Sequence, residues 1–157
     1  MFPLSKKNKS LGLLVLLGLL VEAGIFPLPQ LNSISVWAHE VEVSGDVAAT
    51  FHLEPNHNPG AGQPARVWFA LTRRGGLIIP LEQCNYKLAV YLKNRKDGDK
   101  PLMQPPLKAV SAEKYQGIPG ADIVFPKAGI YELELSGIPQ NQANFKPFKL
   151  TYTVTVR

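Results

Sequence analysis

Short runs of alternating hydrophobic and polar residues fill the chain from about residue 40 to the end. The alternation is clearest at the end, where every second residue from Phe148 to Val156 is hydrophobic. Alternation of β-branched and aromatic residues with polar ones is typical of antiparallel strands that bury one face. Five further strands are predicted at 41–43, 47–53, 66–72, 86–93 and 131–136, with shorter candidates at 77–81 and 121–125.

Turn-forming residues separate these runs, as at 73–76, 96–99 and 126–129. No segment has the spacing of an amphipathic helix. Seven to eight strands without helices predict an all-β fold, an immunoglobulin-like antiparallel β-sandwich, with a cupredoxin-like arrangement as the alternative. Residues 94–120 are rich in proline, lysine and glycine, and we expect them to form the longest irregular connection.

One tyrosine follows a glycine at the start of a predicted strand, in Ala128-Gly129-Ile130-Tyr131. This order is typical of a tyrosine corner, in which the hydroxyl bonds back to the preceding chain. An ordinary core tyrosine is the alternative interpretation.

The N-terminus has the composition of an export signal. Three lysines among residues 6–9 precede an apolar run at 11–21, and Val36 and Ala38 are the small residues that a signal peptidase accepts. Residues 1–38 are therefore predicted to be a signal peptide and export segment, and residues 39–157 a single domain. The exported protein would begin with His39, in the periplasm or an equivalent extracytoplasmic lumen.

Two alternatives for this segment stay open. Cleavage after Ala23 also satisfies the small-residue rule, but it would leave a partly apolar tail at 24–36. A retained anchor is the other, although 11–21 is short of the roughly 20 residues that span a bilayer. Membrane contact is expected only through an uncleaved signal.

Charge and motifs exclude several function classes. Loss of residues 1–38 lowers the formal charge from +5 to +3, and the remaining basic residues are scattered, which argues against nucleic-acid binding. Acidic residues are spread singly, and neither a serine-nucleophile elbow nor a glycine-rich phosphate loop is present. We therefore expect a protein without enzymatic activity.

All three histidines lie near the predicted new N-terminus: His39, His52 and His57. An N-terminal histidine offers an amine and an imidazole to one ion, and nitrogen ligands favour Cu(II) among the divalent first-row metals. His52 lies near the end of a predicted strand, on the face opposite the core residues Phe51 and Leu53. His57 follows five residues later, in a proline-bounded loop. The three are candidate copper ligands, and the alternative is a set of surface histidines without metal.

Carboxylates could complete such a site, either as oxygen ligands or by accepting a hydrogen bond from a ligating imidazole. The candidates are Glu40, Glu54 and Asp122.

Sulfur ligands fit less well. A blue-copper centre needs a histidine shortly after its cysteine, and none follows Cys84, which is expected to be a half-buried packing residue. Met103 is a possible soft ligand, but an exposed loop position is the ordinary interpretation. Trp68 is expected either to pack in the sandwich or to form a recognition surface.

Three features together resemble the YtkA-like and CopC-like periplasmic proteins: the signal ending at Ala38-His39, the stretch 52–69 beginning His52-Leu53-Glu54-Pro55, and the stretch 127–137. The resemblance implies an immunoglobulin-like sandwich and, in the CopC-like branch, binding or transfer of copper. Only His39 matches that branch's copper ligands by position, and its downstream aspartate-x-histidine pair is absent here.

The leading hypothesis is thus an exported, non-enzymatic sandwich that binds or hands over Cu(II). The alternative is a metal-free accessory module that docks on a membrane-associated complex through a sheet edge or the 94–120 connection. A third hypothesis is sugar or small-molecule binding on Trp68 and Tyr91, because aromatic rings can stack on such ligands.

Overall fold

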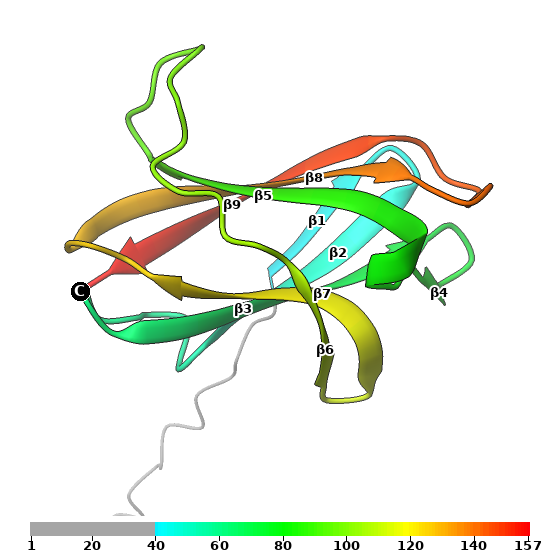
Figure 1. The fold of residues 1–157 in the computed structure, drawn as a ribbon, viewed down its shortest axis with the longest axis horizontal. Helices are drawn as coiled ribbons and strands as arrows, with labels where there is room; N and C mark the ends of the chain where they lie inside the picture. Colours follow the sequence, from blue (N-terminus) through cyan, green and yellow to red (C-terminus); the bar gives the residue numbers. More distant parts are fainter. Residues whose placement is uncertain (1–39) are drawn as a thin grey trace, which may run out of the picture. The chain divides into compact units, whose positions relative to one another are not determined.

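Two antiparallel sheets face each other in the computed structural model, which describes residues 40–157 (Figure 1). Nine strands and one 3-10 turn, η1 (Leu81–Gln83), make up this part of the chain. The strands are β1 (Glu40–Ser44), β2 (Val47–Glu54), β3 (Pro64–Arg73), β4 (Leu77–Ile78), β5 (Cys84–Leu92), β6 (Lys108–Ala112), β7 (Tyr115–Val124), β8 (Gly129–Pro139) and β9 (Phe148–Val156). His39 and the predicted signal segment 1–38 lie outside the described residues.

The larger sheet has the order β1-β2-β3-β7-β6, with β4 paired to β3, and the smaller sheet has the order β5-β8-β9. The chain crosses to the smaller sheet between β4 and β5, returns to the larger sheet between β5 and β6, and crosses again between β7 and β8. As a result β3 lies beside β7, and β5 lies beside β8. This arrangement confirms the predicted antiparallel β-sandwich, with nine strands in place of seven to eight. Residues 40–157 contain no helix long and apolar enough to cross a membrane.

The core lies between the sheets and follows the alternation in the sequence. In β2 and β9 the buried residues are every second one, and their polar neighbours are more exposed. Phe51 of β2 stacks on Tyr152 of β9 with ring centroids 4.6 Å apart, which joins the two sheets near the centre. Burial of such aromatic surface is the main favourable contribution to folding.

Strand β3 differs from the others because both of its faces are buried. Val67, Phe69 and Leu71 face the main core, whereas Trp68 and Ala70 belong to a second, smaller cluster on the other face. Ile118 joins this second cluster from β7. A strand covered on both faces has a continuous hydrophobic run, which explains why 67–71 has no polar residue.

The expectation of an irregular connection over 94–120 is wrong for its second half. Residues Lys108–Ala112 form β6, and β7 already begins at Tyr115. The prolines obscured this hairpin, because proline cannot donate to a strand ladder. Pro119 is accommodated because the pairing of β3 with β7 ends one residue away, at Trp68 and Gly120.

The predicted tyrosine corner is confirmed. The fully buried Tyr131 hydroxyl donates to the Lys127 carbonyl oxygen at 2.8 Å. Gly129 between them has φ of 152°, a conformation that side chains disfavour. The bond fixes the turn that leads into β8.

The tyrosine corner can be tested by removing one oxygen atom. We expect Tyr131→Phe to lower the free energy of unfolding by roughly 1–2 kcal/mol, since a carbonyl at a buried turn loses its donor. The matched control is Tyr152→Phe, whose hydroxyl bonds the Ala49 carbonyl at a longer 3.4 Å and should matter less. Urea unfolding followed by circular dichroism measures both, and equal losses would contradict the assignment.

Candidate functional site

Two of the three histidines meet at one end of the larger sheet. His52 lies near the end of β2, with its side chain on the outer face, and His57 lies in the loop that follows. His57 Nε2 is 3.3 Å from His52 Nδ1, and the ring centroids are 4.6 Å apart. Both rings are half-buried. In the absence of an ion one ring N–H donates to the other ring, in a direction that depends on the tautomers.

The loop backbone turns His57 back toward β2. The His57 amide donates to the Leu53 carbonyl oxygen at 2.9 Å, which closes a five-residue turn. Asn56 and His57 have left-handed φ values of 63° and 51°. Such values are unfavourable for most side chains, so the surrounding contacts must hold this turn.

Backbone bonds to the end of β9 anchor the next part of the loop. The Arg157 amide donates to the Pro59 carbonyl at 3.0 Å, and the Ala61 amide donates to the Arg157 carbonyl at 2.7 Å. The Gly62 amide also donates to the Phe125 carbonyl at 2.8 Å. His57 is therefore carried by a loop that is tied down at both ends.

Trp68 lies beneath His52. The two residues are direct partners in the pairing of β2 with β3, and their rings stack with centroids 4.6 Å apart and planes 14° apart. Trp68 is only 1% exposed, and its indole Nε1 donates to Glu54 Oε1 at 3.3 Å. On the core side, the ring of Phe51 meets His57 edge-on, with centroids 5.9 Å apart. Aromatic rings thus flank the pair on two sides.

The spacing of the two nitrogens suits one shared ion. The two nitrogens are 3.3 Å apart, close enough that both could bind the same ion. Within residues 40–157, however, no three histidine, cysteine or acidic side chains are grouped closely enough to hold a metal. The described pair supplies two ligands and needs a further one.

The three candidate carboxylates have different surroundings. Glu54 accepts the indole N–H of Trp68 beside the pair. Glu40 pairs across β1 and β2 with Phe51, the residue that precedes His52. The pKa of Glu40 is raised, mainly by burial and secondly by the nearby negative charge of Glu42.

Asp122 is held by two cations. Its carboxylate accepts hydrogen bonds from Lys108 and, at 3.0 Å, from Arg66 Nε. Both bonds lower the pKa of Asp122, and the bond from Lys108 has the larger effect. Its neighbour across the sheet is Arg66, whose own partner on the other side is Glu54. Asp122 is thus one strand further from the histidine pair than Glu54.

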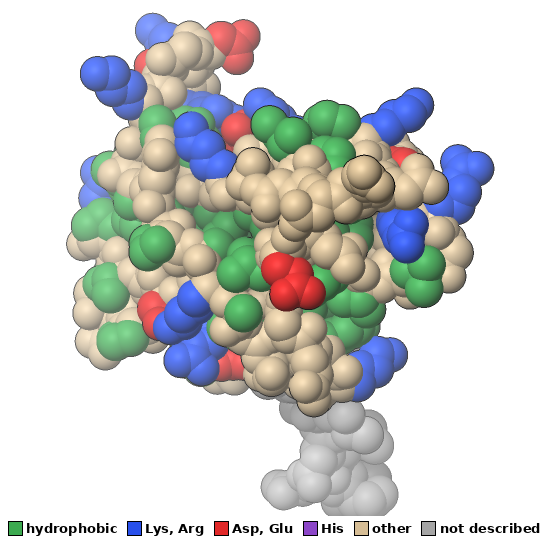
Figure 2. Space-filling view, turned by 45° about the vertical axis from the view of Figure 1, so that its right-hand side comes forward, with side chains coloured by type: hydrophobic (Ala, Val, Ile, Leu, Met, Phe, Trp, Pro, Cys, Tyr) green, Lys and Arg blue, Asp and Glu red, His purple; other side chains and the backbone are tan. Residues whose placement is uncertain are grey.

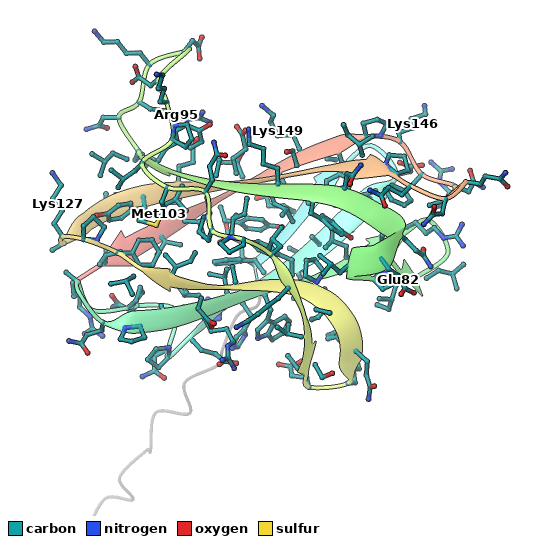
Figure 3. The ribbon with its side chains drawn as sticks, viewed as in Figure 1. Glu82, Arg95, Met103, Lys127, Lys146 and Lys149 are labelled. Atoms are coloured by element: carbon teal, nitrogen blue, oxygen red, sulfur yellow. The ribbon has the colours of Figure 1, made fainter. Side chains whose placement is uncertain are left out.

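The sulfur-containing residues lie elsewhere in the sandwich. Cys84 is buried in the main core, 4% exposed, which fits its expected packing role. Met103 also packs against the main core, and its carbonyl accepts the Val90 amide at 2.9 Å beside β5 (Figure 3). It is half-buried and not an exposed loop side chain.

Neither aromatic residue of the sugar-binding hypothesis offers an open ring face. Trp68 is buried, and Tyr91 is 9% exposed because the guanidinium of Arg95 lies 3.7 Å above its ring. Arg95, which is labelled in Figure 3, forms ion pairs with Glu132 and Glu134 of β8. These contacts argue against a stacking site at either ring.

Basic and acidic side chains are interspersed on the face of the molecule seen in Figure 2, with hydrophobic side chains between them. That face has no large patch of one sign of charge. This distribution of charge agrees with the scattered basic residues of the sequence.

Comparison with known proteins supports the fold. No protein-family model matches the chain, and no curated protein does. FetP of uropathogenic Escherichia coli, solved as isolated after expression in the periplasm, covers 75% of this chain and 93% of its own, with 15% identity and a TM-score of 0.51. A copper-bound glutamate-to-glutamine variant of FetP covers 75% and 94%, with 13% identity and a TM-score of 0.52.

A DUF4426 family protein from Pseudomonas aeruginosa covers 74% of this chain and 96% of its own, with 7% identity and a TM-score of 0.49. At such identities the FetP structures show a shared β-sandwich fold. The comparison supports the sandwich that the resemblance to YtkA-like and CopC-like proteins implies, and it assigns the chain to no family.

The environment of Cys84 predicts an unreactive thiol. Burial raises its pKa to about 11, so almost no thiolate exists near neutral pH, and the thiolate is the reactive form. We expect Ellman's reagent at pH 8 to leave the folded protein almost unmodified and to titrate one thiol after unfolding in guanidinium. Reaction of the folded protein at the rate of a small-molecule thiol would contradict this burial.

Proposed function

We propose that this protein is an exported, non-enzymatic β-sandwich that binds Cu(II) through His52 and His57 together with the N-terminal amine and imidazole of His39. The observation that carries the proposal is the 3.3 Å separation of two imidazole nitrogens at the end of a rigid sheet. Nitrogen ligands of this kind bind Cu(II) more tightly than the other divalent first-row ions.

The course of β1 supports the participation of His39. His39 lies outside the described residues, but a peptide bond joins it to Glu40, and Glu40 is paired with Phe51, the residue before His52. Consecutive Cα atoms are about 3.8 Å apart. The covalent chain therefore allows an N-terminal amine at residue 39 to reach the end of β2 that carries His52.

Two observations support copper and an extracytoplasmic location. The sequence is predicted to carry an export signal that ends at Ala38, and of the FetP structures, which share the fold, one is a copper-bound variant and another is of protein expressed in the periplasm.

The second candidate function is a metal-free docking module of a membrane-associated complex. The observation that favours it is the exposure of two valines on the edge strand β1, 57% for Val41 and 66% for Val43. It also needs no ion, because the two histidine rings can hydrogen-bond to each other. This candidate predicts no copper in the isolated protein and loss of a partner when β1 is made polar.

Copper titration of the exported protein tests the first proposal. We expect one Cu(II) per chain, and we expect His39→Ala, His52→Ala and His57→Ala each to weaken binding by more than roughly 100-fold. A lost ligand should cost more than the 10- to 100-fold typical of groups that only support ligands. The control is Met103→Leu, which changes a sulfur atom outside the pair and should leave binding unchanged.

The N-terminal residue must be determined on the same sample by mass spectrometry. A chain that begins at His39 fulfils the prediction, whereas a chain that begins at Gly24 removes the terminal amine from the site. Unchanged affinity in His52→Ala and His57→Ala would overturn the proposal regardless of the start.

A further inference from the structure

We infer that Trp68 is a positioning residue that holds the imidazole of His52 in the plane needed for copper binding, an inference that rests on the proposed function. The indole and imidazole planes are 14° apart, with centroids at 4.6 Å. A lone pair on an imidazole nitrogen lies in the plane of the ring. Control of the ring plane is therefore control of the direction in which His52 offers its ligand atom.

The indole is itself held on several sides. It is 1% exposed and packs with Ala70 and Ile118 in the second cluster, and the ring of Tyr115 lies 6.2 Å away. Its N–H donates to Glu54 Oε1 at 3.3 Å, which fixes the rotation of the ring in its own plane. Trp68 is thus a fixed surface and not a mobile neighbour.

The residue opposite Trp68 on β7 makes this packing possible. Gly120 pairs with Trp68, and a Cβ atom there would approach the two methyl groups of Val110 to 2.8 and 2.9 Å. Val110 of β6 fills this space and packs against the second cluster. The β6–β7 hairpin, which extends from the larger sheet in Figure 1, therefore supports the surface on which His52 rests.

Stacking and hydrogen bonding determine two different features of the His52 ring. The stack fixes the plane of the ring, and the contact with His57 at 3.3 Å selects the Nδ1 edge. When Nδ1 binds Cu(II), the His52 ring becomes more positive, and an electron-rich indole face attracts such a ring. Trp68 should therefore favour the metal-bound state as well as the geometry of the free one.

The first experiment needs no copper. Long-range proton–nitrogen NMR spectra of the metal-free exported protein report the tautomer of each histidine ring. We expect His52 and His57 of wild type to show the same tautomer, Nδ1–H in both rings or Nε2–H in both, because a fixed bond between His52 Nδ1 and His57 Nε2 requires one of these two arrangements. We expect Trp68→Phe to keep it. Trp68→Leu should shift both rings toward the averaged values of mobile imidazoles. Fixed tautomers in Trp68→Leu would overturn the inference.

The second experiment uses copper. We expect Trp68→Leu to weaken Cu(II) binding roughly tenfold and to broaden or shift the copper EPR spectrum, with Trp68→Phe within about threefold of wild type. The matched control is Phe148→Leu, another buried aromatic residue, which contacts Tyr86 and Phe145. It should lower stability without changing the EPR spectrum.

A further readout is intrinsic fluorescence, because Trp68 is the one tryptophan of a chain that begins at His39. Bound Cu(II) should quench its emission in proportion to occupancy. Copper binding by wild type with an unchanged EPR spectrum in Trp68→Leu overturns the role of Trp68 and leaves the proposed function standing. Absence of copper binding in wild type overturns the proposed function, and the NMR spectra then decide the positioning role alone.

Glu54→Gln keeps the inference testable if Trp68→Leu does not fold. The amide retains an oxygen acceptor for the indole N–H, whereas Glu54→Leu removes it. We expect the fixed histidine tautomers to persist in Glu54→Gln and to become averaged in Glu54→Leu. Glu54 is exposed, so its replacement leaves the core intact. Identical spectra for the two variants would show that the Glu54 contact does not support the stack.

Discussion

The pairing of β2 with β3 is the constraint on which the rest of the site depends. It places Phe51 opposite Phe69 on the core side and His52 opposite Trp68 on the outer side. A slip of one residue would exchange these faces and would bury the histidine in the core. The register is fixed because the core side is fully apolar, so packing energy in the interior determines the geometry of a polar pair on the exterior.

Periodicity in the sequence was sufficient for the strands that bury one face. β2, β8 and β9 alternate cleanly, and their prediction needed no knowledge of the partner strands. β6 and the start of β7 were missed because their segment combines weakly hydrophobic residues with prolines. Val110, Ala112 and Tyr115 of this segment pack against the cluster of Trp68, which is a tertiary contact and leaves no local signal.

The candidate site was predictable in part. The five-residue spacing of His52 and His57, across the end of a strand and a proline-bounded loop, was enough to expect them close together. The roles of Trp68 and Asp122 were not predictable, since they depend on strand order. Glu54, Arg66 and Asp122 form one row across the sheet because β3 lies between β2 and β7. The carboxylate of Asp122 then forms ion pairs with Arg66 and Lys108.

The bonds between the histidine loop and the end of β9 also set the order of assembly. Asn58 and Arg157 are 99 positions apart, yet Arg157 contacts the carbonyls of Asn58 and Pro59. During synthesis, the loop lacks these anchors until the last strand has emerged and joined its sheet. A nascent chain would therefore hold its two imidazoles loosely, and under the proposed function it would bind an ion only after the whole domain has folded.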